Sequence, residues 1–426
     1  MPEASQDTAI RDAVDRGFDE QIDFTAELVR YPSVRGAEHT AQDFMARQMR
    51  ERGLAVDRWI IELDDIKDLP GYSPVNVSYE NALNVVGIHR PRAKKGRSLV
   101  LNGHIDVVPV GPLDMWTTPP YEPRIADGWL YGRGSGDMKA GLVSCIFALD
   151  ALRRAGWQPA AEVFVQSVIE EECTGNGALA CVGRGYVADA ALIPEPRGEA
   201  VLSAQIGVLW FQVKLKGRPV HASVAGEGAN AIEAAGPIIR ALHDMKDRWN
   251  GSRAQHPPFD AVAHPININI GKITGGDWAS SVPAWCDMDV RIAIYPGQDL
   301  ASARFEIEDT VRAAAQKIPF LANNPPEVLF FGFQAEGYIL PEGSDVERAL
   351  GVAHEKVFGD KLLRSPTTAT TDARFFGLYS GMPALVYGPK ASSVHGFDER
   401  VDIESIRRTT QSMALFIADW CGLEAA

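Results

Sequence analysis

The stretch SLVLNGHIDVVPV, residues 98–110, decides the fold, because it begins as a buried strand and ends in groups that a core strand does not carry. Its Leu-Val-Leu run is typical of a strand covered on both faces. His104 and Asp106 then follow, two residues apart. Side chains two apart in an extended chain point the same way, so Asp106 is placed to accept a hydrogen bond from the imidazole of His104. Taken alone, the pair also fits a capped strand end with a surface histidine.

The segments around this stretch alternate between strand and helix patterns. Apolar runs that end in turns or charged groups predict strands, and apolar residues at helical spacing predict the helices between them. This alternation favours an α/β architecture with a mostly parallel sheet. The predicted strands are 81–91, 97–109, 161–169 and 189–196, and the helices between them are 138–157 and 177–187.

The character of the chain changes near Gln205. From residue 205 to residue 338 the order strand, helix, strand, strand, helix, strand resembles a ferredoxin-like α+β unit. The helix and strand patterns of the first part resume after Tyr338. We therefore predict one α/β domain formed by residues 1–204 and 339–426, interrupted by an inserted domain of residues 205–338.

Composition and charge exclude several classes of function. The chain has 426 residues, 46% of them hydrophobic, and a formal net charge of -14, without a Lys/Arg stripe for nucleic acid. No apolar run approaches the about 18 residues of a spanning helix, and the N-terminus lacks the pattern of a signal peptide. Five scattered cysteines predict buried, reduced thiols. We expect a cytoplasmic protein that binds neither nucleic acid nor membrane.

Further acidic and imidazole groups stand where apolar elements begin or end. Asp137 in YGRGSGDMKAG precedes an apolar helix, and the alternative is a simple helix N-cap. Three consecutive carboxylates, Glu170–Glu172, end an apolar strand, where they repel one another unless cations or water solvate them. Glu195 and His395 also follow apolar strands.

Imidazoles and carboxylates without clustered cysteines are a ligand set that suits Zn²⁺, Mn²⁺ or Co²⁺. Two divalent cations would outweigh the carboxylates of Asp137, Glu172 and Glu195 and leave a slightly positive site that favours hydroxide. A competing motif fails: GNGALA, residues 175–180, matches a loose dinucleotide-binding pattern but directly follows three glutamates, which would repel a pyrophosphate.

In this combination the motifs resemble the co-catalytic metallo-hydrolases that include acetylornithine deacetylase, succinyl-diaminopimelate desuccinylase, aminoacylase-1 and glutamate carboxypeptidase. The motifs that carry the resemblance are GHIDVVP, GRGSGDMKAG, EEECTGNG, EP at Glu195, HAS before GANAI, TDARFF and HGFDERV, in this order along nearly the whole chain. The resemblance implies a catalytic α/β domain whose inserted ferredoxin-like domain acts as a lid and forms a homodimer.

The resemblance also implies two divalent metal ions, with zinc expected first and cobalt or manganese as alternatives. It assigns five ligands to them: His104, Asp137, Glu172, Glu195 and His395. Asp137 would bridge the two ions, and the peptide bond between Asp137 and Met138 would be cis. His104 and Glu195 would complete the shell of one ion, and Glu172 and His395 that of the other.

Other residues receive roles from the same resemblance. Glu171 would be the general base that takes a proton from the attacking water and delivers it to the leaving amine, and Asp106 would orient His104. His221 would stabilise the oxyanion, in relatives often from the partner subunit, although it also fits a surface loop. Arg291 would bind the substrate carboxylate, although it also fits a strand surface. Further candidates for substrate contact are Asn267, Thr371 and Arg374.

These observations predict a metal-dependent hydrolase that cleaves the amide bond of an N-acyl amino acid, most like acetylornithine deacetylase. The alternative is a dipeptidase or carboxypeptidase that uses the same site. A binding protein that kept the fold without activity would lack a ligand or the base, and neither is missing from the sequence. The acyl group, the amino-acid side chain and the metal remain open at this point.

Overall fold

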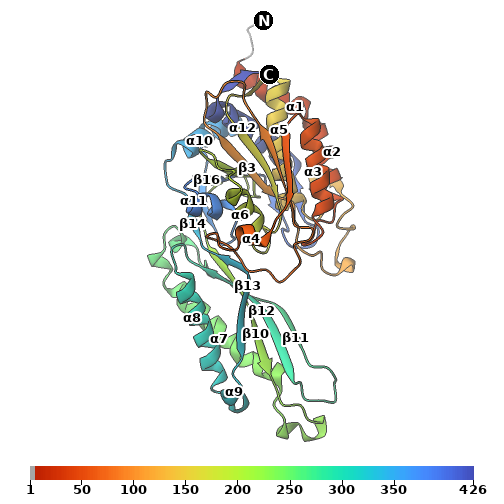
Figure 1. The fold of residues 1–426 in the computed structure, drawn as a ribbon, viewed down its shortest axis with the longest axis vertical. Helices are drawn as coiled ribbons and strands as arrows, with labels where there is room; N and C mark the ends of the chain where they lie inside the picture. The colour runs from red at the N-terminus through yellow and green to blue at the C-terminus, as the bar shows by residue number, and fades with distance from the viewer. Residues whose placement is uncertain (1–4) are drawn as a thin grey trace.

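The computed structural model describes residues 5–426 and shows two parts of different architecture (Figure 1). The larger part carries the C-terminus on the side away from the smaller part. The smaller part extends from it as a single sheet with long helices along one face. The predicted fold class, an α/β domain with an inserted α+β domain, is confirmed.

The central sheet of the larger domain has six strands in the order β1-β2-β7-β3-β8-β16. Strands β7, β3, β8 and β16 are parallel to one another, whereas β2 runs antiparallel to both of its neighbours, β1 and β7. The carboxyl ends of four strands therefore meet at one edge of the sheet. The strand bounds are β1 (Ala55–Ile60), β2 (Leu83–His89), β3 (Leu99–His104), β7 (Val163–Val168), β8 (Ala191–Ile193) and β16 (Ala384–Val386).

Helices cover both faces of this sheet. Gly87 and Gly103 lie on one face, where a Cβ would come within 2.8 Å of Met49 on α3 and 3.1 Å of Leu142 on α5. Asn84 points to the opposite face and donates to the carbonyl of Gly177 on α6 at 2.7 Å. The helices of this domain include α1 (Gln6–Arg16), α2 (Phe18–Val29), α3 (His39–Glu51), α4 (Leu63–Ile66), α5 (Ala140–Arg154), α6 (Asn176–Gly183), α10 (Asp345–Phe358), α11 (Ala373–Tyr379) and α12 (Ile403–Cys421).

Several short strands were not indicated by the sequence. They form small sheets in the orders β14-β9-β15, β17-β18-β5-β4 and β19-β6. Strands this short carry too few residues for a periodic pattern, and their pairing is set by distant parts of the chain. Their bounds are β4 (Arg124–Ala126), β5 (Trp129–Tyr131), β6 (Trp157–Pro159), β9 (Val201–Gln205), β14 (Tyr338–Ile339), β15 (Arg364–Thr367), β17 (Ala391–Ser392), β18 (Arg400–Asp402) and β19 (Leu423–Ala425).

The inserted domain is a four-stranded antiparallel sheet in the order β11-β12-β10-β13. Helices α7 and α8 cover one face, and their apolar residues share a separate core with Leu209, Phe211 and Val213 of β10. The chain order and the strand order are those of a ferredoxin-like unit, as predicted. The bounds are β10 (Gly207–Lys216), α7 (Ala231–Gly251), β11 (Ile268–Gly275), β12 (Trp285–Ile294), α8 (Leu300–Ala315), α9 (Pro319–Asn323) and β13 (Glu327–Ala335).

The chain enters and leaves the inserted domain at neighbouring positions. β9 leads into β10 through Ile206, β13 leads into β14 through Gly337, and β14 pairs with β9. A Cβ on Gly207 would lie 2.8 Å from the backbone nitrogen of Gly337, so glycine lets the two connections run side by side.

Two observations concern the cysteines and the helices of the residues that the structure describes. All five cysteines are buried and free of disulfide bonds. Within residues 5–426, none of the helices combines the length and the apolar composition needed to cross a membrane.

Candidate metal centre and active site

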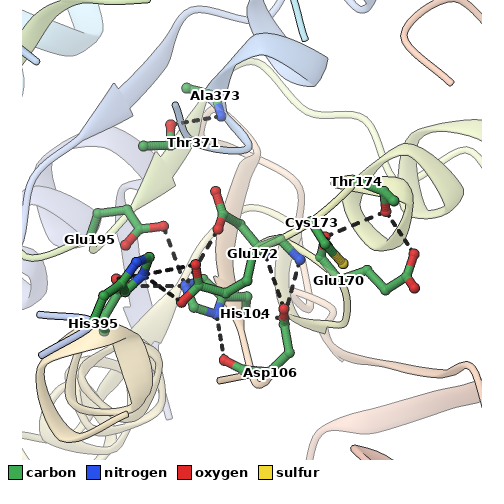
Figure 2. A network of polar contacts seen from close by, with 12 residues as sticks. His104, Asp106, Glu170, Glu172, Cys173, Thr174, Glu195, Thr371, Ala373 and His395 are labelled. Atoms are coloured by element: carbon green, nitrogen blue, oxygen red, sulfur yellow. Dashed lines mark hydrogen bonds and ion pairs between the residues drawn. The ribbon is translucent and has the colours of Figure 1, made fainter. Parts of the chain in front are cut away.

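The predicted ligands come together at the carboxyl edge of the central sheet. His104 is the last residue of β3, Glu172 follows β7, and Glu195 follows β8. His395 comes from the segment that leads from β17 to β18. Figure 2 shows the side chains of His104, Glu172, Glu195 and His395 pointing toward one another. Parallel strands explain this convergence, because their carboxyl ends meet at the same edge.

Asp137 lies between two groups of ligands. Its Oδ1 is 3.1 Å from His104 Nε2, and its Oδ2 is 3.3 Å from His395 Nε2. Glu195 Oε1 lies 3.7 Å from His104 Nε2, and Glu172 Oε2 lies 2.9 Å from His395 Nε2. Each oxygen of Asp137 thus faces one histidine that has a glutamate beside it, which is the arrangement a bridging carboxylate requires.

The electrostatics of this cluster call for cations. Burial raises the pKa of Glu171 and Glu195 well above the usual value, and it also raises that of Glu172, beside the charge of Asp137. Burial acts to lower the pKa of His395, but hydrogen bonds to Asp137 and Glu172 raise it to about 11. The raised pKa values mean that bound protons supply the positive charge that these buried carboxylates need. Imidazole and carboxylate donors of this kind fit Zn²⁺, Mn²⁺ or Co²⁺.

A buried ion pair fixes the loop that carries Asp137. Glu399 Oε1 accepts the backbone N–H groups of Gly136 and Asp137, both at 3.0 Å, while Arg133 Nη1 donates to Glu399 Oε2 at 2.6 Å. Arg133 also donates to the carbonyl of Gly396, next to His395. The pair therefore ties the segment of one ligand to that of another. The peptide bond from Asp137 to Met138 is cis.

The turn that presents Glu171 is held by its neighbour. Glu170 has a left-handed backbone, with φ of 61°, and its carboxylate accepts hydrogen bonds from Arg35, Tyr79 and Thr174. Glu171 itself is buried, and its Oε1 has no hydrogen-bond partner within residues 5–426. A carboxyl group that is buried, near the ligands and unengaged is suited to move a proton.

Asp106 makes a different contact from the one expected. His104 Nδ1 lies 3.0 Å from the backbone carbonyl of Asp106 and 3.5 Å from its carboxylate. The carboxylate instead accepts the backbone N–H groups of Glu171 and Glu172, at 3.2 and 3.1 Å. Asp106 therefore orients the histidine through its main chain and holds the glutamate turn with its side chain.

Two cavities adjoin the cluster. One, of about 370 Å³, lies against the sheet of the inserted domain, and the other, of about 410 Å³, lies against the loop that contains Thr371. Glu171, Glu172, His395 and Arg291 line both. The structure thus places Arg291 and Thr371 beside the predicted metal ligands.

Three predicted residues lie elsewhere. Arg374 is fully buried and donates to the carbonyls of Thr174 and Thr371, so it supports the loops and lines neither cavity. Asn267 also lines neither cavity, whereas Asn269, two residues along β11, lines the first. His221 is exposed and follows the end of β10 that points away from the larger domain (Figure 1).

Other residues of the site were missed. Trp210, Phe331 and Phe333 line the first cavity, and Arg133 with Glu399 positions Asp137. The alternation in GVLWFQVKLKG does place Trp210 opposite Leu209 and Phe211, which was a usable signal. The roles of Phe331 and Phe333 depend on the register of a distant strand, and no local pattern shows them.

A metal-dependent amide hydrolase requires cations that activate water, a buried carboxyl group that moves a proton, and a cavity for a small amide. The fold and the site of this protein are of that class. Residues 100–419 match the model of peptidase family M20/M25/M40. The chain belongs to this family.

Relatives with assigned activities include several amide hydrolases. The chain is 29% identical to an N-formyl-4-amino-5-aminomethyl-2-methylpyrimidine deformylase of Halalkalibacterium halodurans, with 97% of each chain covered. It is 28% identical to a succinyl-diaminopimelate desuccinylase of Methylobacillus flagellatus, over 77% of this chain and 86% of that protein.

Solved structures share the fold at low sequence identity. The dipeptidase Dug1p of Saccharomyces cerevisiae has a TM-score of 0.79 at 16% identity, with 98% of this chain and 99% of that chain covered. Human carnosine dipeptidase 1 has a TM-score of 0.75 at 15% identity, with 97% and 99% covered.

Proposed function

We propose that the protein is a deacylase that hydrolyses the amide bond of a small N-acyl amino acid, with two divalent cations, zinc foremost, held by His104, Asp137, Glu172, Glu195 and His395. The observation that carries the substrate class is Arg291. Its side chain lines both cavities, together with Glu171. The acetylornithine type of reaction, with a carboxylate and a free amino acid as products, suits this arrangement.

Arg291 is a cation without a counter-ion. Within residues 5–426 its side chain forms no ion pair and no hydrogen bond, and burial lowers the pKa of its guanidinium. A partly buried charge of this kind is stabilised when an anion pairs with it. The carboxylate of an amino acid matches the planar fork of arginine through paired hydrogen bonds. Binding there would place the acyl group of the same substrate beside Glu171.

The remaining residues then have defined tasks. When bound, the two cations would lower the pKa of water and polarise the amide carbonyl. Glu171 takes the proton of the attacking water on its free Oε1 and passes it to the nitrogen of the leaving amine.

A formamide of an aromatic methylamine is the second candidate substrate. Two deformylases of this kind, of Halalkalibacterium halodurans and Bacillus subtilis, are 29% and 28% identical over 97% of the chain. Such a substrate has no carboxylate for Arg291. Dipeptides are a third class, because the same centre can attack a peptide bond.

A substrate panel separates these candidates. N-formyl, N-acetyl and N-succinyl amino acids, their methyl esters, dipeptides and N-formylaminomethylpyrimidine are offered to protein loaded with zinc, and amine release is measured. We expect free-acid N-acyl amino acids to be hydrolysed fastest. Hydrolysis of dipeptides alone, or of carboxylate-free amides as fast as of acids, would overturn the proposal.

Arg291→Gln tests the carboxylate site. The variant should lower kcat/KM for the free acid about 10- to 100-fold, which corresponds to the about 1.5–3 kcal/mol of a charged hydrogen bond. The methyl ester of the same substrate is the control, and its kcat/KM should change much less. Equal losses for acid and ester would show that Arg291 supports the fold rather than the carboxylate.

We also propose that the inserted domain forms a homodimer and that His221 completes the site of the partner subunit. His221 is exposed and follows the end of β10 that points away from the larger domain, which carries Glu171. The edge strand β11 and the following turn expose large apolar side chains, among them Ile273 at 49% and Trp278 at 73%. An open edge strand beside such side chains favours pairing with another chain.

Mixed dimers test this assignment. Glu171→Gln and His221→Ala proteins should each be nearly inactive. Exchange of subunits at equal amounts should restore about a quarter of wild-type activity, because half of the dimers are mixed and each then holds one intact site. Activity that stays at the sum of the two variants, with exchange verified by mass spectrometry, would show that His221 acts within its own chain or not at all.

A further inference from the structure

The cavity between the inserted domain and the metal centre has an aromatic wall. On β10, Leu209 and Phe211 are buried in the core beneath α7 and α8, and Trp210 between them is partly buried and lines the cavity, as strand alternation requires. Trp210, Phe331 and Phe333 all line the cavity of about 370 Å³, together with Glu171. We call these three side chains the aromatic wall.

A bulge in β13 builds this wall. Leu209 pairs with Gln334 and Phe211 pairs with Phe330, so three residues of β13 stand opposite Trp210 alone. Extra residues of this kind re-aim side chains, and bulges are frequent beside active sites. As a result, the rings of Phe331 and Phe333 both meet Trp210, with centroids at 6.1 and 5.3 Å and planes at 63° and 88°.

Gly332 makes the bulge possible. Its φ of +57° belongs to the left-handed region, and a Cβ there would come within 2.6 Å of the Trp210 ring. The local backbone is therefore arranged around close contact with the indole.

The wall also offers unused polar groups. The indole N–H of Trp210 is buried and has no acceptor within residues 5–426. Asp289, which lines the same cavity, accepts one hydrogen bond from Gln212 at 2.7 Å, and a carboxylate has room for more. An apolar surface with a few convergent polar groups is typical of a site for a small molecule.

We infer that the aromatic wall binds a planar aromatic or heteroaromatic ring on the amine half of the substrate, and this rests on the proposed deacylase function. Arg291 borders both cavities, so a substrate carboxylate there puts the side chain on the same α-carbon within reach of the wall. Rings that meet edge to face attract one another beyond simple burial, whereas a saturated ring of similar size does not. The favoured substrates are thus N-acyl aromatic amino acids or N-acyl arylmethylamines.

Matched substrates test the inference. N-acetyl-L-phenylalanine should be hydrolysed with a kcat/KM at least tenfold above that of N-acetyl-L-cyclohexylalanine, which has a non-planar ring of similar size, and above that of N-acetyl-L-alanine. N-benzoyl-L-alanine carries its ring on the acyl half and should show no such advantage. N-formylbenzylamine carries the ring without a carboxylate, and its hydrolysis would uphold the wall while moving the substrate class away from amino acids.

Variants assign the preference to the wall. Trp210→Ala and the double variant Phe331→Leu/Phe333→Leu should each reduce the ratio of phenylalanine to cyclohexylalanine substrates to about one. Phe330→Leu is the matched control: this phenylalanine, next in β13, does not line the cavity, and its ring centroid lies 5.8 Å from that of Phe211. It should keep the wild-type ratio.

The outcomes separate the two proposals. Equal rates for planar and saturated rings in wild type, or an unchanged ratio in the Trp210→Ala protein, would overturn the aromatic wall and leave the deacylase intact. If the wild-type protein hydrolyses no N-acyl compound, the proposed deacylase function is wrong. Calorimetric titration with free amino acids then tests the binding of rings to the aromatic wall. L-phenylalanine should then bind at least fivefold more tightly than L-cyclohexylalanine, and equal binding would overturn it.

Discussion

Replacing Glu171 with glutamine should lower kcat by about 10²- to 10⁴-fold, the range contributed by a positioned general acid or base. Glutamine keeps the size of the side chain and one oxygen, but it cannot take a proton from water. Oε1 of Glu171 makes no hydrogen bond within residues 5–426, so the substitution breaks no contact of that atom. The cation content of the variant should equal that of wild type.

The metal content makes this test decisive. Oε2 of Glu171 lies 3.9 Å from His104 Nε2, and the two residues belong with Glu195 to a group that is able to hold an ion. Elemental analysis alongside kcat therefore distinguishes a base from a ligand. Loss of an ion in Glu171→Gln would make Glu171 a ligand and leave the general base unassigned. Glu122→Gln, at an exposed position, is the control for handling and purity.

Replacing Asp137 with asparagine should remove the cations and the activity together. Both oxygens of Asp137 face histidines, at 3.1 and 3.3 Å, and an amide offers one neutral oxygen in place of a bridging carboxylate. The loss of metal affinity should exceed the about 10- to 100-fold typical of a residue that only supports a ligand. We expect less than one ion per chain after dialysis, compared with two in wild type.

Thermal unfolding provides a readout that does not depend on turnover. An ion that binds only the folded state raises Tm with its concentration. Zinc should therefore raise the Tm of chelator-treated wild type and leave that of Asp137→Asn nearly unchanged. Asp114→Asn, at an exposed position, should respond like wild type. A variant that binds two ions with wild-type affinity would show that Asp137 is not the bridge.

The convergence of the five predicted ligands was foreseeable from the sequence, because each stands where a strand or loop meets the edge of a parallel sheet, whereas their roles as ligands were implied by the family resemblance. His104 and Glu195 end apolar runs that were visible without a structure. Once the strands are parallel, convergence follows from topology alone. The turn of Glu170–Glu172 was equally visible, since carboxylates do not end a buried strand without a reason.

The rest of the site depends on contacts between distant segments. Phe331 and Phe333 face the cavity because β13 slips in register against β10, and no local pattern reports such a slip. Arginine is a residue type that often contacts substrates, but the guanidinium of Arg374 donates a hydrogen bond to the carbonyl of Thr174, which is far away in sequence. The edge strand β1 was missed for a related reason, because its partly exposed residues show no run of apolar side chains.

The junction at Gly207 and Gly337 has a consequence for the history of the molecule. The chain leaves and re-enters the larger domain at adjacent points on one small sheet. The inserted domain can therefore be gained, exchanged or lost without a change in the topology of the larger domain. The hydrolytic chemistry resides almost wholly on one side of this seam, and the aromatic wall and Arg291 reside on the other. Evolution can therefore retune substrate choice by altering a module while the reacting groups stay as they are.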